Sequence, residues 1–310
     1  MDCKEWLKQE IARLKKEKNA VILAHFYQRD EVQEIADYIG DSLALAQMAE
    51  KTDADIILLA GVHFMGETAK LLNPDKKVLV PDMEAGCSLA DSCPADEFAA
   101  FVAEHPGYTV ISYVNTSAAV KAHTDIVVTS GNARKVIDSL PKDEKIIFGP
   151  DKNLGGYINT VTGRDMLLWN GACHVHDRFS LQGVVDLKKA HPGAKVLVHP
   201  ECKKPLQLVA DKVGSTASLL KFAREDEATE FIVVTESGIL REMRLSCPEK
   251  TFLAAPADDS ECQCNECEYM KLGTLEKVYA TLRDESPEVT VDPAIAEAAL
   301  RPIRRMLELS

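Results

Sequence analysis

Short apolar runs rich in β-branched residues alternate with helical stretches along most of the chain. They are preceded by residues 4–18, where abundant Lys and Glu around apolar positions predict an exposed amphipathic helix. Alternation of strand and helix patterns is typical of βα units that build parallel sheets. The nine predicted strands form three sets: 21–24, 56–59 and 78–80; 109–112, 126–128 and 146–148; 196–198, 231–234 and 252–254.

The three sets recur at a nearly constant spacing. Their first strands start at residues 21, 109 and 196, roughly 87 residues apart. Twice this spacing, an offset of 174, aligns residues 25–49 with 199–223 without a gap, and seven of the 25 positions are identical. A fixed period of this length indicates repeated supersecondary units. The sequence therefore predicts three related βα units without a long linker, the middle copy being the most diverged.

Composition and charge narrow the class of protein. The chain has 310 residues, 46% hydrophobic and 27% charged, which is ordinary for a globular protein. A net charge of −13 argues against nucleic acid or a membrane surface as a main partner, although small anions need only local positive potential. The nine cysteines and an N-terminus unlike a secretory signal favour a reduced, cytoplasmic protein. Clustered cysteines in that compartment more often bind metal or perform redox chemistry.

Polar side chains follow the first predicted strand of each unit. The pairs are His25 and Tyr27, Tyr113 and Asn115, and His199 and Glu201. Within a pair the residues are two apart, so they face the same side of an extended segment. Ligands of open α/β sheets bind beyond the carboxyl ends of the strands. One histidine after a strand is usually structural, but three equivalent polar strand ends predict a shared site.

A hydroxyl side chain also precedes one helix in each unit. These residues are Ser42, Ser130, and Ser215 with Thr216. Each can be a helix N-cap, which is the more common role. Free N–H groups at a helix start also attract phosphate or carboxylate. Three such starts, one in each unit, would suit a ligand with several negative groups.

Cysteines show the same threefold arrangement. Cys87, Cys173 and the group Cys262, Cys264 and Cys267 each follow the last predicted strand of a unit. One thiolate from each loop would suit an iron–sulfur cluster with one open iron, or a zinc ion with an open position. Cys264 and Cys267 alone could instead form a zinc or redox pair. The other cysteines, Cys3, Cys93, Cys202 and Cys247, are interpreted as plain thiols.

At this point the chain resembles the quinolinate synthase family of bacterial and archaeal NAD biosynthesis. The similar segments run in order through nearly the whole chain: AHFYQ (24–28), GDSLALA (40–46), AGCSLADSCP (85–94), YVNTSAAVKA (113–122), TSGNA (129–133), FGPDKNLG (148–155), CHVHDRF (173–179), HPEC (199–202), GST (214–216), TESGI (235–239) and CNECEYMKL (264–272).

The resemblance implies an α/β fold of three related small domains with parallel sheets around a pseudo-threefold axis, a triplicated three-layer sandwich. The domains are expected at 1–86, 87–172 and 173–267, with a tail, 268–310, packed on the first. It also implies a [4Fe–4S] cluster on Cys87, Cys173 and Cys267. The implied reaction condenses iminoaspartate with dihydroxyacetone phosphate to quinolinate, with release of phosphate and water. An L-aspartate oxidase or aspartate dehydrogenase is the implied metabolic neighbour.

Roles for individual residues follow as hypotheses from the resemblance. Glu201 is the expected general acid and base, beside His199, while His25 and Tyr27 are expected to transfer protons. The expected substrate-binding residues are His25, Ser42, Tyr113, Asn115, Ser130, His176, His199, Glu201, Ser215 and Thr216. His176 could instead support the cluster from behind Cys173.

One departure from the family pattern and two competing functions remain open. Some members carry CxxCxxC before the tail, whereas this chain has Cys262-x-Cys264-x-x-Cys267. Any disulfide between the upstream cysteines is therefore in doubt.

One alternative function is that of an iron–sulfur hydro-lyase acting on a small dicarboxylate. The other is a zinc- or redox-sensing binding protein that uses the three C-terminal cysteines.

Overall fold

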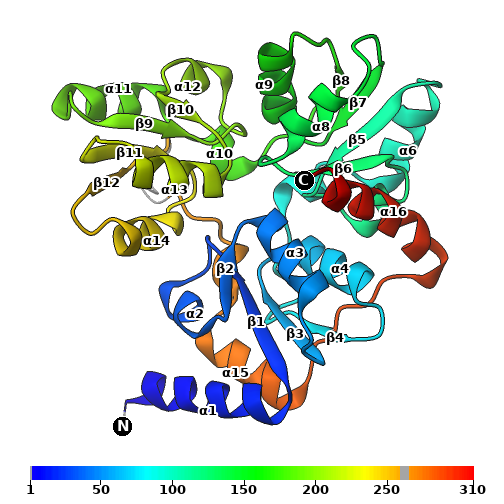
Figure 1. Cartoon of the computed structure of the whole chain (residues 1–310), viewed down its shortest axis with the longest axis vertical. Helices are drawn as coiled ribbons and strands as arrows, with labels where there is room; N and C mark the ends of the chain where they lie inside the picture. The colour runs from blue at the N-terminus through cyan, green and yellow to red at the C-terminus, as the bar shows by residue number, and fades with distance from the viewer. Residues whose placement is uncertain (1, 259–264) are drawn as a thin grey trace.

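A computed structural model describes residues 2–258 and 265–310 as three α/β units (Figure 1). Each unit holds one parallel four-stranded sheet, and the three sheets lie around a common centre. This arrangement confirms the predicted α/β fold of three related small domains. Within the described ranges, no helix combines the length and the apolar character needed to span a bilayer.

All nine predicted strands are present, together with the N-terminal helix. The first unit consists of α1 (Cys3–Glu17), β1 (Ala20–His25), α2 (Asp30–Ile35), β2 (Tyr38–Gly40), α3 (Ser42–Lys51), β3 (Ile56–Ala60), α4 (His63–Leu72) and β4 (Lys77–Leu79). The second consists of α5 (Ser88–Asp91), α6 (Ala95–Ala103), β5 (Thr109–Tyr113), α7 (Ala118–Lys121), β6 (Ile126–Val128), α8 (Ala133–Ser139), β7 (Ile146–Gly149), α9 (Lys152–Thr162) and β8 (Leu167–Leu168).

The third unit and the tail complete the chain. The third unit consists of α10 (His174–Asp177), α11 (Leu181–Ala190), β9 (Lys195–Val198), α12 (Lys204–Leu208), β10 (Lys212–Val213), α13 (Thr216–Glu225), β11 (Glu230–Val234), α14 (Ile239–Ser246) and β12 (Thr251–Ala254). The tail consists of a 3₁₀ turn, η1 (Met270–Leu272), and two helices, α15 (Leu275–Asp284) and α16 (Pro293–Leu309).

The strand order corrects the predicted alignment of the second unit. The sheets run β2-β1-β3-β4, β6-β5-β7-β8 and β10-β9-β11-β12. Therefore β6 corresponds to the edge strands β2 and β10, and β8, not β7, corresponds to β4 and β12. The sequence did not reveal β2, β8 and β10, because these strands have only two or three residues and are mostly half-buried. Such short edges carry no continuous apolar run.

Both faces of each sheet are covered, which gives the predicted three layers. Alternate residues of β1 point to opposite faces, as the period of a strand requires. Ile22 and Ala24 join an outer cluster with α1 and α15, whereas Val21 and Leu23 join a central cluster with α3 and α4. The central cluster continues into the inner faces of the other two sheets. One shared core therefore holds the three units together.

An aspartate at the corresponding position of each unit makes the same pair of backbone hydrogen bonds. Asp37, Asp125 and Asp211 each accept a bond from the backbone N–H of the residue fifteen positions earlier, at 2.8, 2.8 and 2.7 Å. The donors are Ile22, Val110 and Val196, and each accepts a backbone bond back from its aspartate. These donors are 88 and 86 residues apart, close to the spacing predicted from the sequence. They also fix which positions in the three units correspond.

Removal of one such carboxylate should weaken the fold. We expect Asp125→Ala to lower the free energy of unfolding by about 1 kcal/mol, because the Val110 N–H loses a charged acceptor. Denaturant unfolding would measure the loss. Asp143→Ala is the matched control, since Asp143 is exposed and should change stability by a few tenths of a kcal/mol at most. Equal stability of the two variants would contradict a structural role for the repeated aspartate.

The C-terminal tail lies along two of the units (Figure 1). Helix α15 packs against α1, where Leu275, Val278 and Leu282 join the outer cluster. Helix α16 packs against α7 and β6 of the second unit and against α4 of the first. The tail therefore does not pack on the first unit alone, and the domain boundaries themselves stay a prediction.

Candidate active site

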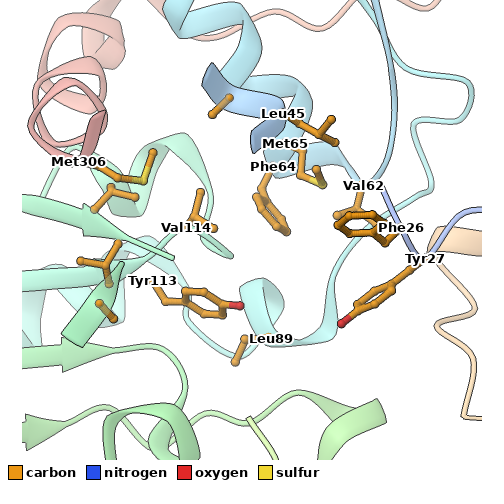
Figure 2. Close-up of a cluster of buried hydrophobic side chains, with 14 of the residues drawn as sticks. Phe26, Tyr27, Leu45, Val62, Phe64, Met65, Leu89, Tyr113, Val114 and Met306 are labelled. Carbon is orange, nitrogen blue, oxygen red and sulfur yellow. The ribbon is translucent and has the colours of Figure 1, made fainter. Parts of the chain in front are cut away.

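The polar strand ends of all three units line one cavity. It has an empty volume of about 720 Å³, part of which is open to solvent. The predicted residues in its wall are His25, Tyr27, Ser42, Cys87, Tyr113, Asn115, Ser130, Cys173, His176, His199, Glu201, Thr216 and Cys267. Tyr27 and Tyr113 come from different units and direct their hydroxyl groups into the space between them (Figure 2).

One predicted residue lies behind the wall instead of in it. Ser215 is buried and accepts a hydrogen bond from the Ser218 backbone N–H at 3.3 Å, so it is the N-cap of α13. At this position the common structural role is the observed one, whereas Thr216 beside it reaches the cavity. Cys262 and Cys264 lie outside the described residues.

Glu201 is the most highly connected acidic group of the cavity. Its Oε1 accepts a hydrogen bond from the Tyr113 hydroxyl at 2.5 Å, and its Oε2 lies 2.9 Å from His176 Nδ1. His199 stacks on His176 with ring centroids 4.6 Å apart. Burial opposes ionisation of Glu201, but His176 and the Tyr113 hydroxyl, which both hydrogen-bond the carboxylate, outweigh burial and hold its pKa well below the ordinary value. The carboxylate is therefore ionised at neutral pH.

His25 and His199 occupy corresponding positions and share one hydrogen-bond pattern. In each ring Nδ1 accepts from the backbone N–H two residues later, at 3.2 Å from Tyr27 and 3.4 Å from Glu201. An acceptor Nδ1 leaves the proton of a neutral imidazole on Nε2. Burial lowers the pKa of both rings to about 3. Both histidines are therefore neutral N–H donors to a ligand across the physiological pH range.

This neutral state can be tested directly. Because a pKa near 3 lies below the ordinary value, both rings should stay neutral as pH falls from 8 to 5 and should protonate only in stronger acid. We expect nitrogen-15 NMR of the metal-free protein to show an Nε2–H tautomer for both rings over that range. The ring signals of the solvent-exposed His123 serve as the reference in the same spectra. A midpoint above about 5 for His25 or His199 would contradict the assignment.

A chain of hydroxyl groups links the first and third units across the cavity. The Tyr27 hydroxyl lies 2.7 Å from Thr216 Oγ1 and 2.8 Å from Thr235 Oγ1. Thr235 Oγ1 also lies 2.9 Å from His176 Nε2. Burial raises the pKa of the Tyr27 hydroxyl well above its ordinary value, so Tyr27 is a proton donor and not a phenolate. The chain gives protons a continuous route from Tyr27 to His176.

The three predicted cysteine ligands are half-buried residues that line the same cavity. Burial raises the pKa of the Cys87 thiol to about 12 and that of Cys267 to about 11, and it raises that of Cys173 well above the ordinary value. Thiols of this kind ionise only when a bound metal offsets their charge. The set therefore fits a group that brings several positive charges.

A second set of possible ligands lies beside Cys173. Among the described residues, the ligand atoms of Cys173, His176 and Glu201 lie within 4.8 Å of one another. His176 Nδ1 is 3.3 Å from Cys173 Sγ, which places this imidazole directly behind one cysteine. The cavity can thus hold a metal group on thiols at one side while Glu201 and His176 face the same space.

Three functional candidates were not predicted from the sequence. Thr235 and Glu236 follow β11, and Asp151 follows β7; all three are buried. The signal was available, because polar residues at the ends of β7 and β11 meet the same condition as those after β1, β5 and β9.

The fold and the cavity define an α/β enzyme whose site offers thiol, imidazole and carboxylate ligands. The chain matches the family model described as quinolinate synthetase A protein over residues 9–308. A quinolinate synthase of Chloroherpeton thalassium is 54% identical over 302 residues, which cover 97% of this chain and 94% of that protein. One of Nostoc punctiforme is 55% identical over 300 residues, with 97% and 92% covered. The chain belongs to the quinolinate synthetase A family and is an enzyme.

Proposed function

We propose that this enzyme condenses iminoaspartate with dihydroxyacetone phosphate to quinolinate, releasing phosphate and water, with a [4Fe–4S] cluster on Cys87, Cys173 and Cys267. The observation that carries the proposal is one half-buried cysteine from each of three corresponding loops, all lining one cavity. Three thiolates leave one iron of such a cluster without a protein ligand. When bound, the cluster would supply a Lewis-acidic iron for a substrate carboxylate or hydroxyl.

Hydroxyl groups and helix starts would bind the anionic groups of the substrates. The two substrates carry two carboxylates and one phosphate, and the protein is acidic overall. Ser42 and Thr216 are the first residues of α3 and α13, where free backbone N–H groups favour anions. Ser130 adds a hydroxyl 3.3 Å from His199 Nε2. Asn115 Oδ1 has no hydrogen-bond partner among the described residues, which leaves it free to orient a bound amine or hydroxyl.

Proton transfer is assigned to Glu201 and the tyrosines. Glu201 is an ionised carboxylate beside a hydroxyl and an imidazole, so it can accept a proton from substrate and pass it on. Tyr27 and Tyr113 are protonated donors on two sides of the space. His25 and His199 would hold a carbonyl or carboxylate oxygen through Nε2–H, which narrows the proton-transfer role expected for them from the sequence.

Metal and sulfide analysis of anaerobically purified protein is the first test. We expect roughly four irons and four acid-labile sulfides per chain. Such protein should form quinolinate from the two substrates. Zinc without sulfide would contradict the cluster and favour the sensing protein. Iron and sulfide with turnover of a hydroxy-diacid alone would favour the hydro-lyase.

The proposal also places the enzyme among its neighbours. Iminoaspartate hydrolyses readily, so an enzyme that oxidises aspartate, such as an L-aspartate oxidase or aspartate dehydrogenase, would need to supply it. A reduced cytoplasm suits free thiols and an oxygen-sensitive cluster. Small-molecule partners, with neither nucleic acid nor a membrane, suit the net charge of −13.

A further inference from the structure

The three units can be compared position by position beyond their third strands. The repeated aspartate bonds make Ile22, Val110 and Val196 correspond. Two residues later, Ala24, Ser112 and Val198 pair with Ala60, Gly149 and Val234 of the neighbouring strands. Two residues further along those strands, the corresponding residues are Val62, Asp151 and Glu236. Two units thus carry a carboxylate where the first carries a valine.

Asp151 joins its own helix to the loop that bears Cys173. One oxygen, Oδ1, accepts from the Leu154 backbone N–H at 2.7 Å and caps α9. The other, Oδ2, accepts from the Cys173 backbone N–H at 3.2 Å. The side chain is fully buried, so loss of either bond would leave a buried N–H without an acceptor.

Glu236 repeats this arrangement in the third unit. Its Oε2 accepts from the Gly238 backbone N–H at 2.7 Å, at the start of α14. Its Oε1 accepts from the Cys267 backbone N–H at 3.1 Å. The same Oε1 lies 3.0 Å from Lys271 Nζ, which donates to the Tyr27 carbonyl at 2.7 Å. Glu236 thereby ties the Cys267 loop to the segment that holds Tyr27.

The first unit holds its cysteine loop differently. The Val62 side chain cannot accept a hydrogen bond, and the neighbouring His63 N–H donates to the Ala85 carbonyl at 2.7 Å instead. The loop before Cys87 is therefore anchored at Ala85, two residues before the cysteine, by a hydrogen bond between backbone groups. The asymmetry supplies an internal reference, because one cysteine of the three lacks a carboxylate anchor.

We propose that Asp151 and Glu236 are positioning residues that hold the Cys173 and Cys267 loops in the geometry needed to bind the metal group, each through one carboxylate oxygen on the cysteine N–H. This inference rests on the proposed function only in taking these cysteines as metal ligands. It assigns a role to two buried acids to which the proposed function gives none.

Site-resolved alkylation would test the anchors without a cluster. The full-length cluster-free protein and its variants would be treated with N-ethylmaleimide, and each cysteine would be followed by peptide mass spectrometry. In Glu236→Ala we expect Cys267 to react about tenfold faster, the change that loss of one buried hydrogen bond of average strength allows. In Asp151→Ala we expect the same change at Cys173. Cys87 should keep its parental rate in both variants.

Conservative variants separate anchoring from general destabilisation. Glu236→Gln and Asp151→Asn keep one acceptor oxygen, which suffices for one of the two N–H groups, and should give rates between those of the parent and of the alanine variants. If Asp151→Ala does not fold because α9 loses its cap, Asp151→Ser keeps a capping oxygen but is too short to hold both N–H groups. It should still expose Cys173. Equal acceleration of all three cysteines, or none, would overturn the proposal.

The loaded enzyme supplies an independent measurement. Anaerobic holoenzyme would be challenged with an iron chelator, and release of iron followed by absorbance. We expect about tenfold faster release from Glu236→Ala and Asp151→Ala than from the parent enzyme, with the amide variants in between. A different result would separate the two proposals. If the anchored cysteine is alkylated faster in the variants but the parent protein binds no iron, the anchoring proposal stands and the cluster assignment is overturned.

Discussion

Serine at Cys87, Cys173 or Cys267 is expected to lower turnover by about a thousandfold or more, because a Lewis-acidic metal supplies several kcal/mol of transition-state stabilisation. Each thiol is the only cysteine that its unit contributes to the described wall of the cavity. A serine hydroxyl is a poor ligand for iron, so two thiolates would have to hold the group alone. Turnover and iron per chain should fall together in each variant.

Cys93→Ala and Cys247→Ala are the matched controls. Both thiols are buried, but Cys93 packs in the core of the second unit with Phe98 and Val110, and Cys247 lies in the central cluster. We expect both variants to lose about 1 kcal/mol of stability while keeping iron and activity. Full activity in any one of the three serine variants would remove that cysteine from the ligand set.

The strands inside the three sheets were all predicted from the sequence because they are buried on both faces. β1, β3, β9 and β11 lie inside their sheets, so each must be apolar at nearly every position, which leaves a continuous run in the sequence. β2, β8 and β10 lie outside β1, β7 and β9 and carry partly exposed residues, so nothing in their composition marks them. Because β8 was not predicted, β7 was wrongly aligned with β4 and β12 of the other two units.

The cavity was predictable because parallel strands end at one edge. His25, Tyr113 and His199 end corresponding strands of three different sheets, so they meet because the three units also face a common centre. The state of each group was not predictable, because it depends on contacts between units. The Tyr113 hydroxyl reaches Glu201, which lies 88 residues away in the chain, and this bond together with His176 decides that Glu201 is ionised. Neither spacing nor composition contains that contact.

Glu201→Gln should lower turnover by about a thousandfold while leaving the metal content unchanged. Glutamine has nearly the same shape and can still accept from Tyr113, but it cannot take up a proton at any working pH. Iron and sulfide per chain should therefore match the parent, in contrast to the cysteine variants. Measurement of both quantities on one preparation distinguishes a lost proton carrier from a lost metal group.

The pH dependence gives the second half of this test. Because the pKa of Glu201 is held below its ordinary value, the carboxylate stays ionised as pH falls through 4.5 and becomes protonated only in stronger acid. Parental kcat/KM should show no acid limb from Glu201 between pH 5 and 8. Glu225→Gln, at an exposed surface position, is the control and should keep parental rates. If Glu201→Gln also keeps them, Glu201 only orients Tyr113 and His176, and proton transfer must belong to the Tyr27, Thr235 and His176 chain.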